Sequence, residues 1–333
     1  MQAGDYINTI LLVGAGALGS RHLQSLVAHK ANDLERHVYV YDPSVAALNM
    51  ARQRVEEVDQ AANVFVYYSD NLNFTINSFD VAIVATSASV RLAAIKSIIA
   101  VYKIDYFVLE KILFQSQSVL DEARSFLNDN AKGVWVNCPR RYFPSYKKLA
   151  NLYHDATAIH MSVSGNLWGM ACNTIHFIDL WFFLAKISSY SISLSNVSPF
   201  IFDSKRIGFK EVSGKISCSS GSNQLDLDCT NDPSLPFSIK VKIRSNKYTT
   251  YVDEIERTVD TIDLYTNKNT SDDFLMMNQS EMSGLVVDEI LLSGDCSLAG
   301  FNESYSIHSA FLEEFLMFFK KNLPSRIELC PIT

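Results

Sequence analysis

The sequence predicts an α/β protein, with a doubly wound parallel sheet in its first part and an α+β region after it. Up to about residue 140, short apolar runs alternate with helical patterns, as in parallel strands joined by helical crossovers. Beyond that point, apolar and polar residues alternate in several runs, which is typical of half-exposed antiparallel strands. The length of 333 residues fits two domains, which we place at residues 1–138 and 139–333.

The first helix is preceded by a glycine-rich turn, residues 14–19, and its helical pattern covers residues 21–30. Gly14 allows a sharp turn, Gly16 lets backbone N–H groups approach a phosphate, and Gly19 lets the helix pack closely on the sheet. The N-terminus of the helix then faces the phosphate charge. The pattern predicts a dinucleotide site, although glycine turns also close many purely structural junctions. Its pyrophosphate would lie against Gly14, Gly16, Ala17, Leu18 and Gly19.

The second strand ends on an acid, Asp42. A carboxylate at this place can accept hydrogen bonds from both hydroxyls of the adenosine ribose. The 2′-phosphate of NADP would meet the same negative charge. Pro43 and Ser44 follow, with no adjacent arginine that could bind such a phosphate. We therefore expect the cofactor to be NAD rather than NADP.

The later elements of the chain follow from the same patterns. Strands are expected at residues 63–69, 80–86, 105–111 and 133–139, with helices at 44–57, 89–103 and 116–130. The run 80–85 is continuously apolar, which predicts a central strand covered on both faces. In the second domain, the patterns predict strands at 224–228 and 238–244, a long polar loop or lid at 266–284, and a last helix at 304–321 with a core-facing phenylalanine stripe.

Composition excludes several classes of protein. The net charge of −7 and the lack of a basic stripe argue against a nucleic-acid partner. The N-terminus shows no export signal, and the apolar run near residues 175–184 is interrupted by Asp179, so we expect no membrane span. Six cysteines without a CxxC pair predict reduced thiols in the cytoplasm and no metal site.

Five segments resemble, in order, motifs of the glucose-fructose oxidoreductase, inositol dehydrogenase and rhizopine-catabolism family, Gfo/Idh/MocA. Residues 14–22 resemble its GxGxxGxRH turn, and residues 84–87 the ATP end of its fourth strand. Residues 110–113 stand where the family has E-K-P-L. Residues 137–142 resemble its N-R-R-F segment, and residues 176–179 fall at its H-x-x-D.

The resemblance implies a Rossmann domain followed by a domain whose large open, mainly antiparallel sheet covers the active-site cleft. It implies an NAD-dependent oxidoreductase that transfers hydride between nicotinamide and a carbinol of a sugar or nucleotide-sugar, a sugar dehydrogenase of carbohydrate metabolism. The second sheet would also mediate homo-oligomers, a homodimer or homotetramer. The nucleotide-binding residues would further include Thr86, Ser87, Glu110 and Lys111.

Lys111 is the leading catalytic candidate. Hydride leaves a carbinol only as its hydroxyl loses a proton, so a base must lie near the alcohol. Lys111 ends an apolar strand at the edge where open sheets bind ligands, and desolvation there would lower its pKa. The alternative is an ordinary exposed lysine. Glu110 points to the opposite face of the strand, toward the ribose or nicotinamide end of the cofactor.

His176 and Asp179 share one face of a helix, where the acid could orient the imidazole. A buried histidine with a structural role is the alternative. The resemblance implies that both residues are catalytic, together with Lys111. Substrate oxygens would contact Lys111, Arg140, Arg141, Tyr142, Asn173 and His176, although solvated surface arginines are an equal alternative for the two arginines.

Two residues depart from the family pattern. Cys172 stands where the family has an acid one helical turn before the histidine, and we expect it to be a packed thiol rather than a nucleophile. Ile112 replaces a proline whose preceding bond is typically cis, so a trans Lys111–Ile112 bond is expected. These departures leave two alternative functions open: an NAD-dependent hydrolase or eliminase using transient oxidation, and a non-catalytic dinucleotide-binding sensor.

Overall fold

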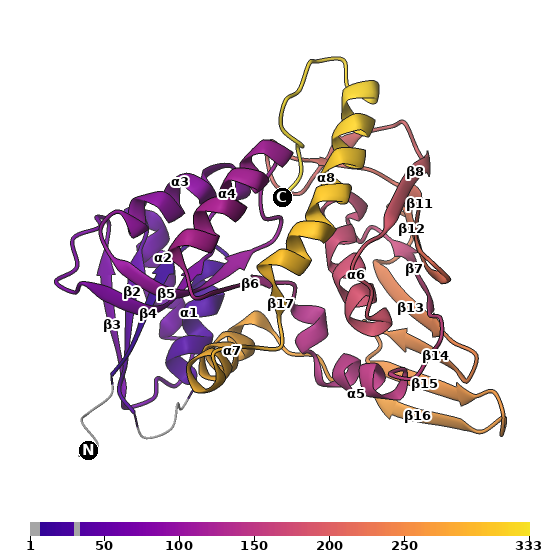
Figure 1. Ribbon diagram of the computed structural model, residues 1–333, viewed down its shortest axis with the longest axis horizontal. Coiled ribbons are helices and arrows are strands. Elements are labelled where there is room, and N and C mark those ends of the chain that lie inside the picture. The colour runs from indigo at the N-terminus through magenta and orange to yellow at the C-terminus, as the bar shows by residue number, and fades with distance from the viewer. Residues whose placement is uncertain (1–6, 30–33) are drawn as a thin grey trace. The chain divides into compact units, whose positions relative to one another are not determined.

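The computed structural model describes residues 7–29 and 34–333, which form two compact units (Figure 1). The first unit runs to Phe114 and also takes in residues 119–137 and 277–301. The second comprises residues 115–118, 138–276 and 302–333. Residues 277–301 thus lie in the first unit although they follow the second sheet in sequence, and the expected domain boundary at residue 138 stays a prediction.

The first unit contains a seven-stranded sheet in the order β17-β6-β5-β4-β1-β2-β3. Its strands are β1 (Asn8–Val13), β2 (Arg36–Tyr41), β3 (Val64–Ser69), β4 (Ser78–Val84), β5 (Lys103–Glu110), β6 (Gly133–Asn137) and β17 (Ala299–Gly300). All neighbours are parallel except β17 and β6. The continuously apolar strand β4 is central, as predicted. The order reverses between β1 and β4, and ligands of open α/β sheets bind at the carboxyl ends of the strands there.

Helices cover both faces of this sheet. They are α1 (Gly19–Ala28), α2 (Val45–Val55), α3 (Ala88–Ile99), α4 (Gln117–Asn130) and α7 (Gln279–Ser293). Figure 1 shows α3 and α4 on one face and α1 and α7 on the other. Asp288 of α7 binds the fully buried Arg36 of β2, and it also binds His29 at 2.7 Å. These contacts explain why α7 joins the first unit although it follows the second sheet in sequence.

The polar segment 266–284 is not a long loop, so that expectation was wrong. It contains strand β16 (Asn269–Asp273) and the start of α7. Its polar residues have a local role at the helix start: the Asn278 side chain accepts from the backbone, and Glu281 accepts from the Asn278 N–H at 2.7 Å. This reciprocal capping box satisfies N–H groups that have no partner within the helix.

The second unit contains an eight-stranded sheet in the order β16-β15-β14-β13-β7-β12-β11-β8. Its other strands are β7 (His160–Asn166), β8 (Ser191–Val197), β11 (Gly214–Ser220), β12 (Asn223–Thr230), β13 (Ser238–Arg244), β14 (Tyr248–Asp253) and β15 (Thr258–Asp263). Only β7 and β12 pair in parallel, which confirms a mainly antiparallel sheet.

Helices α5 (Pro144–Leu152), α6 (Met170–Ala185) and α8 (Phe301–Asn322) lie on one side of this sheet (Figure 1). The short pair β9 (Phe202–Asp203) and β10 (Lys210–Glu211) and a 3-10 helix at Pro139–Tyr142 complete the unit. Phe311, Phe315 and Phe319 of α8 are fully buried and Phe318 is half-buried, so three of the four expected phenylalanines are core.

Candidate functional site

The turn after β1 has the conformation that its glycines predict. Gly14 has φ +94°, and its N–H donates to the Tyr41 carbonyl at 2.8 Å. A Cβ on Gly19 would lie 1.8 Å from the Gly14 carbonyl oxygen, so α1 can begin this close to the turn only with glycine. A Cβ on Gly16 would meet no atom within 4 Å. The backbone there is open to a ligand, and the N-terminus of α1 follows directly.

Asp42 lies against this turn. One carboxylate oxygen accepts from the Ala15 N–H at 2.7 Å, and the other accepts from the Ser44 N–H at 2.8 Å. Each carboxylate oxygen has two lone pairs, so further hydrogen bonds can be accepted. The structure therefore brings together the glycine turn and the acid that sequence analysis assigned to one dinucleotide site.

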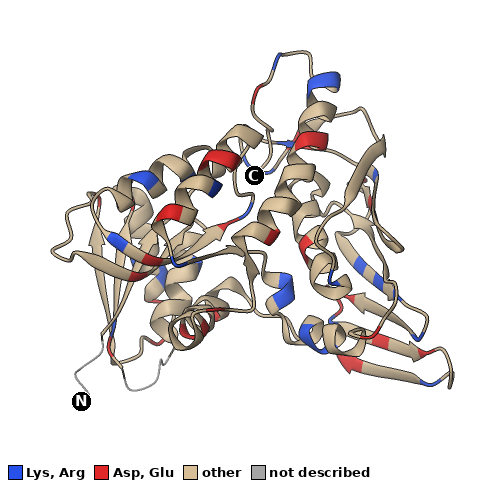
Figure 2. Cartoon of the chain, viewed as in Figure 1, with Lys and Arg blue, Asp and Glu red and all other residues tan. Residues whose placement is uncertain are grey.

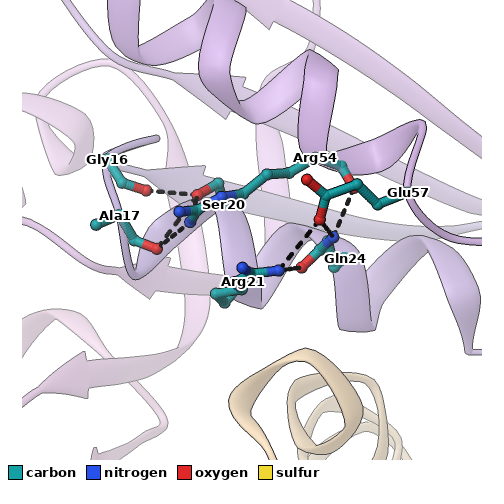
Figure 3. Close-up of polar contacts among 7 residues, drawn as sticks. All are labelled: Gly16, Ala17, Ser20, Arg21, Gln24, Arg54 and Glu57. Carbon is teal, nitrogen blue, oxygen red and sulfur yellow. Dashed lines mark hydrogen bonds and ion pairs between the residues drawn. The ribbon is translucent and has the colours of Figure 1, made fainter.

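Arg54 of α2, which no sequence pattern indicated as a site residue, binds the glycine turn (Figure 3). Its guanidinium donates to the Ala17 carbonyl at 2.5 Å and to the Ser20 hydroxyl at 2.6 Å. Gln24 donates to the Arg54 carbonyl at 2.6 Å and to Glu57 at 2.9 Å, which ties α1 to the end of α2. No sequence motif identifies Arg54. The sequence shows only that it lies near the end of the helix expected at residues 44–57.

Replacing Arg54 with methionine should weaken NAD binding about 3- to 10-fold, because the Ala17 carbonyl and the Ser20 hydroxyl lose the hydrogen bonds that fix the glycine turn. Calorimetric titration of NAD measures the effect. Arg52→Met is the matched control: Arg52 lies on the same helix but contacts Asn49 and the Tyr68 ring instead. Equal affinities of the two variants would contradict this role.

At the next strand ends, a buried arginine joins two predicted site segments. Ser87 caps α3 and Thr86 precedes it, after β4. Arg91 of α3 is 1% exposed and donates to the carbonyls of Thr86 at 2.6 Å, Leu113 at 2.7 Å and Ile112. Burial lowers the pKa of Arg91 to about 10, and nearby Glu110 opposes the shift, so the guanidinium is charged at neutral pH. Arg91 thus fixes the backbone of the two residues that follow Lys111.

The Lys111–Ile112 peptide bond is cis, so the expected trans geometry was wrong. That expectation considered only the intrinsic preference of a non-proline bond. The Ile112 side chain is fully buried, and its carbonyl accepts from Arg91. Tertiary contacts therefore fix the chain immediately after Lys111.

Glu110, the residue before Lys111, belongs to a buried polar network. One of its oxygens is bonded to the His22 imidazole at 2.9 Å and to the Asn137 amide at 2.5 Å. Gln279 of α7 connects to Asn137 at 2.7 Å and to His22 at 3.2 Å. Burial alone would raise the pKa of Glu110, but His22 and Asn137 hold it below its ordinary value. Its contact with the cofactor stays a prediction.

In the second unit, Arg141 is committed to a buried ion pair. Its guanidinium donates to both carboxylate oxygens of Asp179, at 2.8 and 2.7 Å, and to Glu303 at 3.1 Å. Burial would lower the pKa of Arg141, but the two carboxylates raise it above its ordinary value. Arg141 is therefore not a solvated surface arginine. His176 and Asp179 are both buried on α6, and the orienting role of Asp179 stays a prediction.

Arg140 makes a second bidentate pair. It donates to the two oxygens of Glu254 at 2.8 and 2.7 Å and lies over the Phe177 ring. The Tyr146 hydroxyl donates to the same carboxylate at 2.7 Å. Tyr142, from the same segment, is 5% exposed. Both arginines thus have internal partners, and substrate contact by Arg140, Arg141 or Tyr142 remains a prediction.

A carboxylate from elsewhere in the chain lies at the start of α6. Glu211 of β10 accepts from the N–H groups of Ala171 at 2.7 Å and Cys172 at 3.2 Å. Burial raises the pKa of Glu211, against hydrogen bonds from the Cys172 thiol and the backbone. Asn173 donates to the Trp168 carbonyl at 2.6 Å. Residue 172 is a cysteine, but the Glu211 carboxylate lies beside it. No local sequence motif could predict this contact, because Glu211 lies 39 positions away.

No family model and no curated protein matches the chain. Among solved structures, an oxidoreductase from Agrobacterium radiobacter in complex with NAD+, L-tartaric acid and magnesium matches with TM-score 0.70 and 12% identity, covering 92% of this chain and 94% of that one. UDP-N-acetylglucosamine 3-dehydrogenase GnnA from Acidithiobacillus ferrooxidans matches with TM-score 0.66 and 12% identity, over 93% and 97%. The transcriptional regulator Gal80p from Kluyveromyces lactis matches with TM-score 0.66 and 12% identity, over 97% and 95%.

The chain has the fold of these proteins. The two-part architecture implied by the resemblance is therefore confirmed. Lys111 lies in the first unit and His176 in the second, so their joint action stays a prediction.

Other expectations concern the chain as a whole. Within residues 7–29 and 34–333, no helix is both long and apolar enough to cross a bilayer. No disulfide joins the six cysteines, all of which lie in that part of the chain. Residues 1–6, on which the expected lack of an export signal depends, lie outside the described residues.

Proposed function

We propose that the chain is an NAD-dependent oxidoreductase that transfers hydride between nicotinamide and a carbinol of a sugar or nucleotide-sugar. The observation that carries the proposal is the Asp42 carboxylate, 2.7 Å from the Ala15 N–H of the glycine turn. The open backbone at Gly16 and the adjacent start of α1 fit a pyrophosphate. Residues 14–19 would hold that group, Asp42 the adenosine ribose, and Thr86, Ser87 and Glu110 the nicotinamide half.

Bound NAD would supply the hydride acceptor. Lys111 would take the carbinol proton as the C–H bond breaks, with His176 as its relay partner and Asp179 orienting the imidazole. The backbone of Lys111 is fixed on both sides: Glu110 is held by His22 and Asn137, and Ile112 by Arg91. Such support is what a precisely placed base requires.

The substrate class rests on chemistry and on the matched structures. A UDP-N-acetylglucosamine dehydrogenase and a tartaric acid complex share this fold, and both small molecules carry secondary alcohols. Asn173 and Tyr142 would add polar contacts for further hydroxyl groups. The proposal is tested by following NADH production across a panel of sugars and nucleotide-sugars.

The match to the transcriptional regulator Gal80p favours a second candidate, a non-catalytic dinucleotide-binding sensor. NAD binding without turnover of any substrate in the panel would support the sensor. Consumption of a sugar with retained cofactor and no net NADH would instead indicate the hydrolase or eliminase. Steady NADH production would support the dehydrogenase.

Replacing Asp42 with alanine should weaken NAD binding roughly 10- to 100-fold, because charged hydrogen bonds to the ribose are lost. It should also narrow the preference for NAD over NADP, since the repelling charge is gone. Titration of both cofactors into native protein and variant measures this, and Asp42→Asn separates charge from shape. A native preference for NADP would overturn the assignment.

A further inference from the structure

Strand β3 lies at one edge of the first sheet and lacks the features that usually protect such an edge. An edge strand leaves backbone groups unpaired, and proteins commonly protect it with charged residues, a proline, a bulge or a very short length. The six residues of β3 include no proline and no charged residue, and the strand is tan throughout in Figure 2. Its register with β2 continues without a shift from Val64 to Ser69.

The other edges of the two large sheets each have one of these protections. Strand β17 has only two residues. Strand β16 carries Asp272 and Asp273. Strand β8 pairs with β11 across a register shift between Lys215 and Ser217. In the part of the chain that the structure describes, β3 is therefore the large-sheet edge that is open to pairing with another strand.

Two residues of β3 direct their backbone groups away from the sheet. The Asp42 N–H donates to the Ser69 carbonyl at 3.3 Å, and the ladder between β2 and β3 is parallel and regular. The odd-numbered residues of β3 thus bond to β2, and the even-numbered ones point outward. The Val64 carbonyl accepts from a nearby glutamine amide at 2.6 Å. Val66 and Tyr68 remain to offer their N–H and C=O groups to a further strand.

The two faces of β3 differ. On one face, Arg52 of α2 lies over the Tyr68 ring. On the other, residues 70–77 lead from β3 to β4 without forming a helix that could cover the strand. Phe65 and Tyr67 of this second face are 41% and 40% exposed. We call these two residues the aromatic patch.

The rings of the aromatic patch are supported by neighbours on β2. Tyr67 stacks on Tyr39 with ring centroids 4.7 Å apart, and Phe65 meets His37 edge-on at 5.1 Å. Rings held in this way lose little conformational freedom when another apolar group packs on them. A strand that adds to β3 would place every second side chain on the side of the patch.

The charges around β3 are acidic. Residues 55–79 contain no lysine or arginine and four exposed acids, which are Glu56, Glu57, Asp59 and Asp70. Three of these acids precede the strand and one follows it. The preceding arginines are already engaged, Arg52 with the Tyr68 ring and Arg54 with the glycine turn. A segment that pairs along β3 therefore meets negative charge at both ends, which basic residues complement.

We propose that β3 binds an extended segment of a partner protein, which adds to the first sheet as a further strand. The segment has alternating apolar side chains where it pairs and lysine or arginine on both sides of that stretch. Its backbone exchanges hydrogen bonds with Val66 and Tyr68, and its apolar side chains pack on the aromatic patch. In strand addition of this kind, the backbone bonds supply affinity and the alternating side chains supply selectivity.

The same charges argue against a second copy of the chain as the occupant. Two copies of β3 paired in antiparallel fashion would bring Asp70 of each copy toward the acids that precede β3 in the other. Juxtaposed like charges disfavour such pairing. The open stretch is also short, and two residues with two rings offer far less than the roughly 800 Å² that each partner buries in a stable interface.

The test uses the full chain and two peptides with blocked ends. The basic peptide is Lys-Lys-Thr-Val-Thr-Val-Thr-Val-Lys-Lys, and the acidic peptide has glutamate in place of every lysine. Fluorescence anisotropy of the labelled peptides should show at least about 10-fold tighter binding of the basic one. Binding should also slow the amide hydrogen exchange of Val66 and Tyr68, because their N–H groups gain acceptors.

Tyr67→Lys places a positive charge within the aromatic patch and should weaken binding of the basic peptide at least about 10-fold. Tyr251→Lys is the matched control, since Tyr251 is a 44% exposed tyrosine on strand β14 of the second unit. It should bind the peptide as the native chain does. Circular dichroism checks that both variants are folded. If Tyr67→Lys does not fold, the two peptides and the amide exchange of the native chain decide the question.

Three results would each overturn the inference: no saturable binding of the basic peptide, equal binding of the two peptides, or unchanged exchange of the Val66 and Tyr68 amides. Equal loss of binding in Tyr67→Lys and Tyr251→Lys would contradict it as well. A native chain that self-associates, and that Tyr67→Lys makes monomeric, would assign the edge to a second copy instead. None of these outcomes depends on NAD or on the proposed enzyme activity.

Discussion

Lys111→Met should lower turnover by roughly 10²–10⁴-fold while NAD still binds, which is the usual scale of general acid-base assistance. Methionine keeps the length and apolar stem of lysine but cannot exchange a proton. The backbone on either side is held by Glu110 and Arg91, so the substitution should leave the surrounding structure in place. Steady-state NADH production gives the rate, and titration with NAD gives the affinity.

The matched variant is Cys172→Ser, which tests the thiol that replaces the family's acid. We expect a far smaller effect on turnover, since its neighbourhood is that of a packed helix start capped by Glu211. Near-normal activity of Lys111→Met would remove the lysine from the mechanism. Loss of activity in Cys172→Ser with intact NAD binding would revive a nucleophilic thiol.

The fold was predictable because its signals are local. Continuous apolar runs identified the buried parallel strands, and the central place of β4 followed from that pattern alone. The glycine turn and Asp42 were predictable for the same reason: each residue acts where it stands in the sequence. Their contact, the Ala15 N–H to Asp42, follows from the parallel pairing of β1 and β2.

The residues that support the site were not predictable, because their partners are distant in sequence. Gln279 reaches Asn137 across 142 positions, and Glu211 reaches Ala171 across 40. The segment leading into α7 was misread for a related reason. Its polar residues resemble a loop, yet Asn278 and Glu281 are the capping residues of a helix whose packing lies in the first unit. Periodicity detects a helix interior better than a polar helix start.

The two arginines of the second unit show the same limit. From the sequence alone, Arg140 and Arg141 could equally be substrate-binding residues or solvated surface arginines. The structure pairs both with carboxylates: Arg140 with buried Glu254, and Arg141 with buried Asp179 and partly exposed Glu303. A bidentate partner more than 30 positions away leaves no mark on the local pattern.

Arg91→Met should destabilise the folded protein by about 3 kcal/mol or more, because two buried carbonyls and one partly buried carbonyl lose their donor at once. The carbonyls of Thr86, Ile112 and Leu113 belong to irregular segments, and Arg91 is their shared donor. Methionine fills the space of the aliphatic stem, so the loss reports the hydrogen bonds rather than a cavity. Urea-induced unfolding measures the change.

Arg124→Met is the comparison for this prediction, since Arg124 is exposed on α4 and such surface substitutions usually change stability by less than about 0.5 kcal/mol. The location of the lost bonds adds a second expectation. Ile112 and Leu113 follow Lys111 directly, so the variant should also lose turnover under conditions where it remains fully folded. Equal stability of the two variants would show that the hydrogen bonds of Arg91 do not stabilise the segments that contain Thr86, Ile112 and Leu113. Lost stability with native turnover would instead show that the Arg91 hydrogen bonds do not position Lys111. The position of the lysine would then depend on Glu110 and its hydrogen-bond network alone.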